Sequence, residues 1–390
     1  MAHLDTDLVV VGAGIVGLAA ARELSERRPD LRIRVLERER AVGMHQTGSN
    51  SGVAHAGIYY KPNSLKARLC VDGIQRMYAF CEERGIAHER CGKLIVALDD
   101  SELEGLAELE HRGHANGVPG LRRLDADGLR EIEPHATGVA ALHSPHTGIV
   151  DFGAVARAMA TELVERGTEV RLNNEVAGLR SEDGHVVISE ASGETRAQRA
   201  LICAGFWTDR LAHGAGAPSD PRIVGFRGAY LRLRPESRAL VRGLIYPVPN
   251  PRLPFLGVHL TKRVDGEILL GPTAIMDTRG LHRTLTWPGT WRMMAEHWRA
   301  GLTELRLRAS RKAFVATCSR YVPALTDDDV LEGPFGVRAM AVGRDGTLVD
   351  DFVVHDAAGG VFVRNAPSPA ATSSLALGRL IADRVQATLR

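Results

Sequence analysis

The sequence predicts an α/β fold that begins with a Rossmann-type parallel sheet. Three observations lead to this prediction: an uncharged β-branched run near the N-terminus, a glycine pattern directly after it, and a high glycine content. The chain has 41 glycines among 390 residues, about 10.5%, whereas proteins average about 7%. Glycine is favoured where the backbone turns sharply or approaches a ligand closely, so the excess suggests a ligand site.

Composition and charge exclude several classes of protein. The 49 lysines and arginines against 47 aspartates and glutamates give a net charge of +2 with interspersed signs, which is no basis for binding nucleic acid. A hydrophobic content of 44% with 25% charged residues excludes global disorder. The five cysteines include no C-x-x-C pair, so we expect neither a disulfide framework nor a metal site.

The longest apolar stretch, residues 8–21, is not typical of a targeting or membrane segment. Asp5 and Asp7 precede it, where a signal peptide would carry basic residues. Its 14 residues include three glycines, and the stretch is too short to span a bilayer. We therefore expect a cytoplasmic protein, with peripheral contact to a membrane left open.

The same stretch is typical of a dinucleotide-binding turn. Residues 7–11 predict a buried parallel strand, a helix follows the glycines, and residues 33–36 predict a second strand that ends in Glu37. The first glycine allows the tight turn, the second lets backbone approach a pyrophosphate, and the third allows close helix–strand packing. Glu37 is placed to accept hydrogen bonds from ribose hydroxyls. The motif is Gly12, Ala13, Gly14, Ile15, Val16 and Gly17.

Later segments favour FAD over NAD because they return to the same sheet. Asp151 is predicted to cap a helix over 154–166, with strands at 169–172 and 175–176 after it. Residues 199–205 and 360–364 predict two further strands, and a final helix runs to about Val385. The N-terminus of that helix would face the negative edge of a reduced flavin. The cofactor-binding residues expected on these segments are Val176, Ala204, Gly205, Trp207, Pro369, Ala370, Ala371 and Thr372.

The loop after the second strand, over 45–62, is too long for a simple connection, and its residues are small, polar and aromatic. Small residues would let backbone amides line a flat ring, and Asn50 and Ser51 could donate to flavin edges. The cofactor candidates in and before this loop are Arg38, His45, Thr47, Asn50, Ser51, Gly52 and Val53.

At this point the sequence resembles a known family. The segments HQTGSNSGVAHAGIYYKPNSLKARLC, CGKLIVA, SPHTGIVDF, PRIVGFRGAYL, IYPVPNPRLPFLGVHLT and VRNAPSPAATSS are similar to L-2-hydroxyglutarate dehydrogenases, also called oxidases, of the D-amino-acid-oxidase-like flavoproteins. The resemblance implies FAD-dependent oxidation of (S)-2-hydroxyglutarate to 2-oxoglutarate, with electrons passed to quinone, another acceptor or oxygen. It also implies a discontinuous FAD domain (1–80, 145–215 and 331–390) and a substrate domain on an antiparallel sheet (81–144 and 216–330).

Oxidising a 2-hydroxy dicarboxylate needs a base and a cation for each carboxylate. The resemblance to flavin amine oxidases, in which a G-φ-R element holds the substrate carboxylate, makes Arg338 the candidate for the C1 carboxylate and a cofactor contact. His259 and His55 are the candidate bases, with His259 preferred because its alternating strand would form a site wall. A buried structural histidine is the alternative for each. Candidates for the distal carboxylate are Tyr60, Lys61, Lys93, Arg227 and Tyr230.

Some alternatives stay open. Lys93 interrupts an apolar strand, so a salt bridge within the protein is as plausible as a substrate contact. His45 could attach the flavin covalently, although we expect non-covalent FAD. The residues 277–308 depart most from the family, which allows a related 2-hydroxy acid as substrate. Other possibilities are an amine oxidase of the glycine- or sarcosine-oxidase type and a flavin-binding protein without activity.

Overall fold

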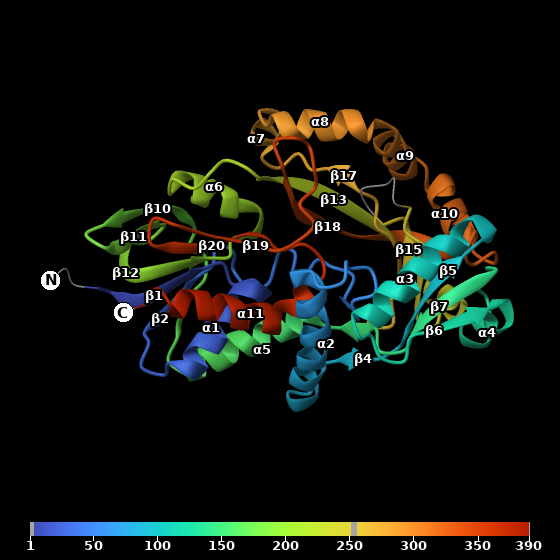
Figure 1. Cartoon of the computed structure of the whole chain (residues 1–390), viewed down its shortest axis with the longest axis horizontal. Helices are drawn as coiled ribbons and strands as arrows, with labels where there is room; N and C mark the ends of the chain where they lie inside the picture. The colour runs from blue at the N-terminus through green and yellow to red at the C-terminus, as the bar shows by residue number, and fades with distance from the viewer. Residues whose placement is uncertain (1–3, 251–255, 390) are drawn as a thin grey trace.

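The computed structural model describes residues 4–250 and 256–389, and it is built on two large sheets (Figure 1). In the first sheet, β9, β2, β1, β12 and β20 run parallel in that order, while β10, β11 and β19 pair antiparallel at its margins. Three distant segments of chain build this sheet, as the sequence predicts. Its strands are β1 (Thr6–Val11), β2 (Ile33–Leu36), β9 (Glu169–Arg171), β10 (Val176–Glu182), β11 (His185–Glu190), β12 (Gly193–Ile202), β19 (Val353–Ala357) and β20 (Gly360–Asn365).

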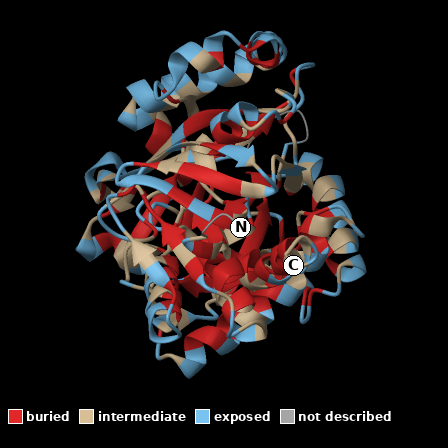
Figure 2. Ribbon diagram, turned by 90° about the vertical axis from the view of Figure 1, so that its left-hand side faces the viewer, coloured by how far each residue is buried: buried red, intermediate tan, exposed pale blue. Residues whose placement is uncertain are grey.

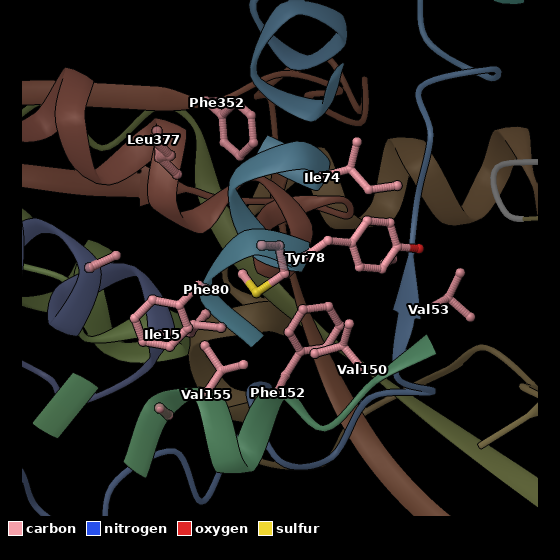
Figure 3. Packing of buried hydrophobic residues seen from close by; sticks show 14 of the residues in the cluster. Ile15, Val53, Ile74, Tyr78, Phe80, Val150, Phe152, Val155, Phe352 and Leu377 are labelled. Atoms are coloured by element: carbon pink, nitrogen blue, oxygen red, sulfur yellow. The ribbon is translucent and has the colours of Figure 1, made fainter. Parts of the chain in front are cut away.

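Four helices pack together beside the first sheet: α1 (Ile15–Arg27), α2 (Leu65–Glu83), α5 (Phe152–Glu165) and α11 (Ala370–Gln386). Figure 3 shows their shared core, in which Ile15, Tyr78, Phe152 and Leu377 come from the four different helices. Asp151 caps α5 as predicted, because its carboxylate accepts a hydrogen bond of 2.8 Å from the amide of Ala154. This packing fixes the N-termini of α1 and α11 relative to the sheet.

The second sheet is mainly antiparallel, as the family resemblance implies. Its two longest strands, β13 (Arg222–Leu233) and β18 (Val330–Val342), pair along almost their whole lengths. The remaining strands are β5 (Lys93–Ala97), β6 (Arg122–Asp125), β7 (Ala140–Ser144), β14 (Leu244–Pro247), β15 (His259–Lys262), β16 (Ile268–Gly271) and β17 (Ile275–Met276). A small third sheet joins β3 (Val53–Ala54), β4 (His88–Glu89) and β8 (Gly148–Val150).

β18 belongs to the second sheet, whereas the predicted domain boundary places residues 331–342 in the FAD domain with the first sheet. β18 forms no ladder with the first sheet in the described residues and instead pairs with β13. The reason is that both strands are long and antiparallel, so β18 completes the second sheet before the chain returns to β19 and β20. The chain therefore crosses between the two sheets close to residue 343.

Six helices lie around the second sheet. α3 (Leu103–Ala115) contacts β5 and β7, and α10 (Arg311–Ser319) contributes Phe314 and Val315 to a second core. α4 (Ala126–Ile132) adds Leu129 to the same core. The other three, α7 (Leu281–Leu285), α8 (Pro288–Glu296) and α9 (Trp298–Ala309), form an arm over residues 281–309 at the top of the molecule (Figure 1). None of the helices in the described residues combines the length and apolar composition needed to cross a bilayer.

Candidate active site

A cavity of about 540 Å³ lies where the carboxyl ends of β1, β2 and β12 face β13 and β18 of the second sheet. Ligands of open α/β sheets bind at this edge of the strands. The wall contains most residues that the sequence predicts to bind cofactor. These are Gly12, Gly14, Ile15, Val16, Glu37, Arg38, His45, Thr47, Asn50, Ser51, Val53, Val176, Ala204, Gly205, Trp207, Arg338, Pro369, Ala370, Ala371 and Thr372.

The glycine turn between β1 and α1 has no room for side chains. A Cβ on Gly12 would lie 2.5 Å from the Cys203 carbonyl oxygen, and its φ of +102° also favours glycine. A Cβ on Gly17 would lie 2.3 Å from the Gly12 carbonyl oxygen, so Gly17 lets α1 pack against the turn without itself reaching the cavity. Gly14 differs, because its nearest neighbour would be the Thr47 hydroxyl at 3.5 Å. Its open side faces the cavity, as a pyrophosphate site requires.

Glu37 is almost fully buried at the end of β2, where the sequence predicts a ribose contact. Its two carboxylate oxygens accept hydrogen bonds from the amides of Ala13 at 2.8 Å and Glu39 at 3.0 Å. These bonds fix the carboxylate beside the glycine turn. Each carboxylate oxygen has a second lone pair, so both can still accept from a ligand hydroxyl.

Trp207 marks the outer part of the cavity wall. The Arg38 guanidinium lies 4.3 Å from the centre of its ring, and the ring of His45 lies 5.1 Å away. His45 Nε2 is also 3.2 Å from a carboxylate oxygen of Glu39. Arg38, His45 and Trp207 thus lie together on this part of the cavity wall.

The loop after β2 is held by its own side chains. Asn50 donates both amide hydrogens to the backbone carbonyls of Gln46 at 2.9 Å and Thr47 at 2.7 Å. Its carbonyl oxygen accepts from the Gly52 amide at 2.8 Å. Asn50 therefore has no amide hydrogen left for a flavin edge, which corrects the expectation that it donates there. Gly52 itself lies outside the wall and adopts a φ of +81°.

The start of α11 closes the opposite end of the cavity. Residues 368–372 line it, and the first amides of a helix have no partner within the helix. The Thr372 hydroxyl accepts a hydrogen bond of 3.1 Å from the His55 amide, which ties the loop to this helix. The positive end of the 17-residue helix is thus presented to the ligand. Its N-cap is Pro369, and no side chain caps it.

Three of the predicted substrate or catalytic side chains line this end of the cavity: His55, Tyr230 and Arg338. His55 Nε2 lies 3.5 Å from the Ser368 hydroxyl, and its Nδ1 is buried without a hydrogen-bond partner. Burial, together with the charges of Lys93 and neighbouring cations, holds the pKa of His55 well below 6.5. The imidazole is therefore neutral and able to accept a proton.

Lys93 lies beside the cavity wall rather than in it. It is 1% exposed, and its ammonium group lies 4.6 Å from the ring centre of Tyr59 and 4.8 Å from that of Tyr246. Within the described residues, no carboxylate lies within ion-pair distance of it, so the structure does not contain the internal salt bridge considered as an alternative. Burial lowers the pKa of Lys93 from 10.5 to about 7.

His259 is near enough to Lys93 to feel its charge but does not line the cavity. Its ring stacks on Tyr246 with the centres 4.0 Å apart, and its Nδ1 is 2.9 Å from the Gly257 carbonyl oxygen. Burial lowers the pKa of His259 to about 4, and the Arg338 and Lys93 charges add to this effect. On β15 the residues on both faces are buried, so the alternation that favoured His259 does not mark an exposed wall.

The other predicted substrate residues also lie outside the wall. Arg227 is exposed on β13 and stacks on Phe335 with the guanidinium 3.9 Å from the ring centre. Lys61 is exposed, whereas Tyr60 is buried with the Lys66 ammonium 5.0 Å from its ring centre. None of the three lines the cavity, although Tyr60 hydrogen-bonds Ser368, the neighbour of His55, and Arg227 pairs with Val337 beside Arg338.

Several wall residues were missed by the sequence analysis. Gln46 joins the loop over 45–62, called here the flavin-side loop, to β18, because its side-chain oxygen accepts a hydrogen bond of 3.0 Å from the Ala339 amide. Ser368 faces His55, and Asn174 lies near the nucleotide end. Gln46 and Ser368 lie within two of the sequence segments that carry the family resemblance, so the sequence could have indicated them as wall residues. Nothing in the pattern around Asn174 distinguishes it from an ordinary turn residue.

Comparison with known proteins identifies the family. The family model described as FAD dependent oxidoreductase matches residues 7–384. The chain belongs to this family.

Relatives at moderate identity confirm the more specific resemblance. The mitochondrial L-2-hydroxyglutarate dehydrogenase of Homo sapiens is 46% identical, over 97% of this chain and 88% of that protein. The L-2-hydroxyglutarate dehydrogenase of Indibacter alkaliphilus is 38% identical, over 97% of this chain and 98% of that protein. The chain is thus a member of the FAD-dependent oxidoreductases with L-2-hydroxyglutarate dehydrogenases among its relatives.

Solved structures support the fold. The L-alpha-glycerophosphate oxidase of Mycoplasma pneumoniae with FAD bound has a TM-score of 0.81 at 22% identity, covering 98% of this chain and 94% of that chain. Glycine oxidase from Geobacillus kaustophilus has a TM-score of 0.75 at 18% identity, with coverages of 98% and 95%.

The residues present fit FAD, the cofactor of this family. The Gly12 turn and the open side of Gly14 suit a pyrophosphate, and buried Glu37 suits a ribose. At the other end, the α11 N-terminus and the backbone of the flavin-side loop suit the flavin ring, whose C2 carbonyl edge becomes negative on reduction.

Proposed function

We propose that this FAD-dependent oxidoreductase oxidises L-2-hydroxyglutarate to 2-oxoglutarate. The observation that carries the proposal is the pair of cations at one end of the cavity: Arg338 in the wall and Lys93 buried beside it without a carboxylate partner. Two cations close enough to a neutral histidine for both charges to lower its pKa match a dicarboxylate that carries a hydroxyl group. The L-2-hydroxyglutarate dehydrogenases among the relatives support the same substrate.

Arg338 is the proposed partner of the C1 carboxylate. It belongs to β18 and lines the cavity, one residue before Ala339, whose amide is bound by Gln46 of the flavin-side loop. A guanidinium forks around a carboxylate with two parallel hydrogen bonds, which fixes the orientation of the substrate as well as binding it. The neighbouring Tyr230 hydroxyl is kept protonated by burial, which raises its pKa. It can therefore donate a further hydrogen bond to the same carboxylate.

Lys93 is the proposed partner of the distal carboxylate. An ammonium group buried between two tyrosine faces loses its hydration, and those faces replace only part of it. A substrate carboxylate would supply the missing counter-charge and return the pKa of Lys93 towards its usual range. Binding of the dianion and protonation of Lys93 are therefore coupled.

His55 is the proposed base, in place of the earlier preference for His259. His55 lines the cavity and is neutral, whereas His259 stacks on Tyr246 away from the wall. When bound, FAD would supply the acceptor for the hydride that leaves C2 of the alcohol. His55 Nε2 would take the proton of the C2 hydroxyl as the carbonyl forms, with the substrate hydroxyl replacing that of Ser368 as its hydrogen-bond partner. His259 then acts as a positioning residue for Tyr246 and Lys93.

The two sheets are proposed to have different roles in binding. The first sheet, with residues 1–80, 145–215 and the segment after β18, is proposed to hold FAD non-covalently. The second sheet supplies the substrate wall through β13 and β18. Electrons are proposed to leave to a quinone, another carrier or oxygen, with peripheral contact to a membrane for a lipid-soluble acceptor.

A substrate panel tests the proposal. The purified holoenzyme is supplied with a soluble dye as acceptor and with L-2-hydroxyglutarate, D-2-hydroxyglutarate, L-lactate, glycerol 3-phosphate, glycine or sarcosine. We expect turnover of L-2-hydroxyglutarate with a kcat/KM far above the other five. Preferred turnover of lactate, glycerol 3-phosphate or an amine would refute the proposal.

A further inference from the structure

The proposed chemistry leaves a proton on a histidine whose surroundings disfavour a positive charge. When a hydride leaves C2 and the alcohol becomes a ketone, the hydroxyl proton remains on His55 Nε2. Burial and four neighbouring basic side chains hold the pKa of His55 well below 6.5, so the imidazole must lose this proton before it can act as a base again. The four are Lys93 of β5, His259 of β15, Lys66 of α2 and Arg338 of β18.

The imidazole can release the proton from only one of its two nitrogens. Among the described residues, Nδ1 of His55 is buried without a hydrogen-bond partner, so it has no group to which it could pass a proton. Nε2 lies 3.5 Å from the Ser368 hydroxyl. Once C2 is a carbonyl, the substrate has no hydroxyl left for Nε2, and the Ser368 oxygen can accept the Nε2 proton. The proton therefore leaves His55 towards Ser368.

The Ser368 hydroxyl connects His55 to a second hydroxyl. It is hydrogen-bonded to the Tyr60 hydroxyl, and a hydroxyl can accept one hydrogen bond while it donates another. Burial raises the pKa of Tyr60 well above 10, so the phenol stays protonated. Tyr60 can therefore pass a proton on only by giving up its own as it receives the next. The two adjacent hydroxyls form a path along which a proton can be exchanged.

The path leads outward, because Tyr60 lies close to an exposed carboxylate. Tyr60 is 8% exposed, and the Lys66 ammonium group lies 5.0 Å from its ring centre. The same ammonium group pairs at 2.5 Å with Asp350, whose side chain is 87% exposed. The negative charge of Asp350 also acts on Tyr60. Elsewhere, buried residues fill the interior around the first sheet and its helices, as Figure 2 shows.

We propose that the hydroxyls of Ser368 and Tyr60 carry the substrate proton from His55 to the solvent beside Asp350. Ser368 Oγ accepts the Nε2 proton and gives its own proton to the Tyr60 oxygen. The Tyr60 hydroxyl proton passes to the Asp350 carboxylate or to water beside it. Each hydroxyl gains one O–H bond and loses one, so the path needs no oxidant or reductant. The inference rests on the proposed role of His55 as base, and it gives Tyr60 a role in place of the predicted substrate contact.

Proton release during flavin reduction tests this path. The holoenzyme is mixed anaerobically with L-2-hydroxyglutarate in a weakly buffered solution that contains a pH-indicator dye, and the flavin and dye absorbances are followed together. We expect the wild type to release the hydroxyl proton as fast as the flavin bleaches. Tyr60→Phe keeps the ring but removes the hydroxyl, so its proton release should lag behind bleaching by about tenfold or more. Release that keeps pace with bleaching in Tyr60→Phe would overturn the inference, because the proton would then leave through the cavity.

Further variants locate the path. Ser368→Ala removes the first hydroxyl and should show the same lag. Tyr78→Phe is the matched control, because its hydroxyl donates to the His146 carbonyl at 3.0 Å, away from the path. Asp350→Asn should also delay release, and added imidazole should remove this delay, because a mobile base reaches an exposed side chain. Prompt release in Ser368→Ala, or an equal lag in Tyr78→Phe, would overturn the inference.

Steady-state kinetics distinguish the path from a merely structural role of Tyr60. The reset of His55 follows hydride transfer, so kcat and KM of Tyr60→Phe should fall together by about tenfold while kcat/KM stays unchanged. A loss of kcat/KM would contradict the inference, because Tyr60 would then support substrate binding or the fold. If another alcohol of the substrate panel bleaches the flavin and L-2-hydroxyglutarate does not, only the proposed substrate is wrong. The release measurement with that alcohol then decides the path.

Discussion

Lys93→Met should make the protein more stable and a poorer enzyme. The structure buries the ammonium group completely and gives it no carboxylate within ion-pair distance among the described residues. Methionine has nearly the same length and shape without the charge. The substitution therefore removes a buried cation while leaving the packing almost unchanged.

The magnitude follows from the pKa of Lys93. Burial lowers it from 10.5 to about 7, which corresponds to a cost of about 5 kcal/mol for the charged form at about 1.36 kcal/mol per tenfold change in proton affinity. The charged lysine therefore costs about 5 kcal/mol at a pH below 7, and Lys93→Met should recover a large part of this cost.

The stability that Lys93→Met gains over the wild type depends on pH. The unfolded chain keeps the Lys93 proton up to pH 10.5, whereas the folded chain releases it near pH 7. The unfolded state therefore binds more protons across this window, and the stability of the wild type rises with pH there. The advantage of Lys93→Met is complete below pH 7 and disappears towards pH 10.5.

Urea unfolding of the apoprotein at a pH just below 7 and at a pH near 10 measures this difference. With the holoenzyme, the same variant should raise KM for L-2-hydroxyglutarate by about tenfold to a hundredfold, since a charge-assisted contact is lost. A variant that is less stable than the wild type below pH 7 would show that Lys93 has a stabilising anionic partner. A more stable variant with unchanged KM would remove Lys93 from the substrate site.

The remaining predictions concern the cofactor turn, the base and the carboxylate clamp. Gly17→Ala should lower the unfolding free energy of the apoprotein by about 1–3 kcal/mol, because its Cβ would meet the Gly12 carbonyl oxygen at 2.3 Å. Gly14→Ala should change that free energy by less than about 1 kcal/mol, because the nearest neighbour of its Cβ would be 3.5 Å away. This second variant should reduce only the flavin content. Equal apoprotein stability of the two would contradict this. His55→Gln should reduce the rate of flavin reduction by about 10²–10⁴-fold. In the wild type that rate should stay constant as the pH falls through 6.5, because the pKa of His55 is held well below this value. A rate that halves at pH 6.5 would refute the assignment of His55 as the base. Arg338→Met should raise KM for L-2-hydroxyglutarate by about 10²–10⁴-fold through the loss of two charge-assisted hydrogen bonds, whereas Arg227→Met, outside the cavity wall, should change it little. Similar effects of both would show that the clamp is misassigned.

The dinucleotide end could be predicted from the sequence because its constraints are local. The Gly12 turn, the strand before it and Glu37 lie within 31 residues, and each residue type follows from backbone geometry or from a single hydrogen bond. The structure puts all of them where the pattern requires. The predicted strand at 33–36 coincides with β2.

The substrate end could be predicted only in part because its geometry depends on pairings that are distant in the chain. His55 reaches Thr372 across 317 positions, and Lys93 meets Tyr246 through the parallel pairing of β5 and β14. The alternating pattern around His259 favours it as the base. Alternation along one strand cannot show that both faces of β15 are covered, and the structure covers both. Which of the two sheets contains β18 likewise depends on its partner strand β13, which begins more than 100 residues earlier.

Reduction of the bound flavin by the two enantiomers of 2-hydroxyglutarate tests the central claim most directly. The purified yellow holoenzyme is mixed with each enantiomer under anaerobic conditions, and the visible absorbance of the flavin is followed. We predict rapid bleaching by the S enantiomer alone, slowed strongly in His55→Gln and requiring far more substrate in Arg338→Met. Bleaching by neither enantiomer, or by the R enantiomer alone, would contradict the account.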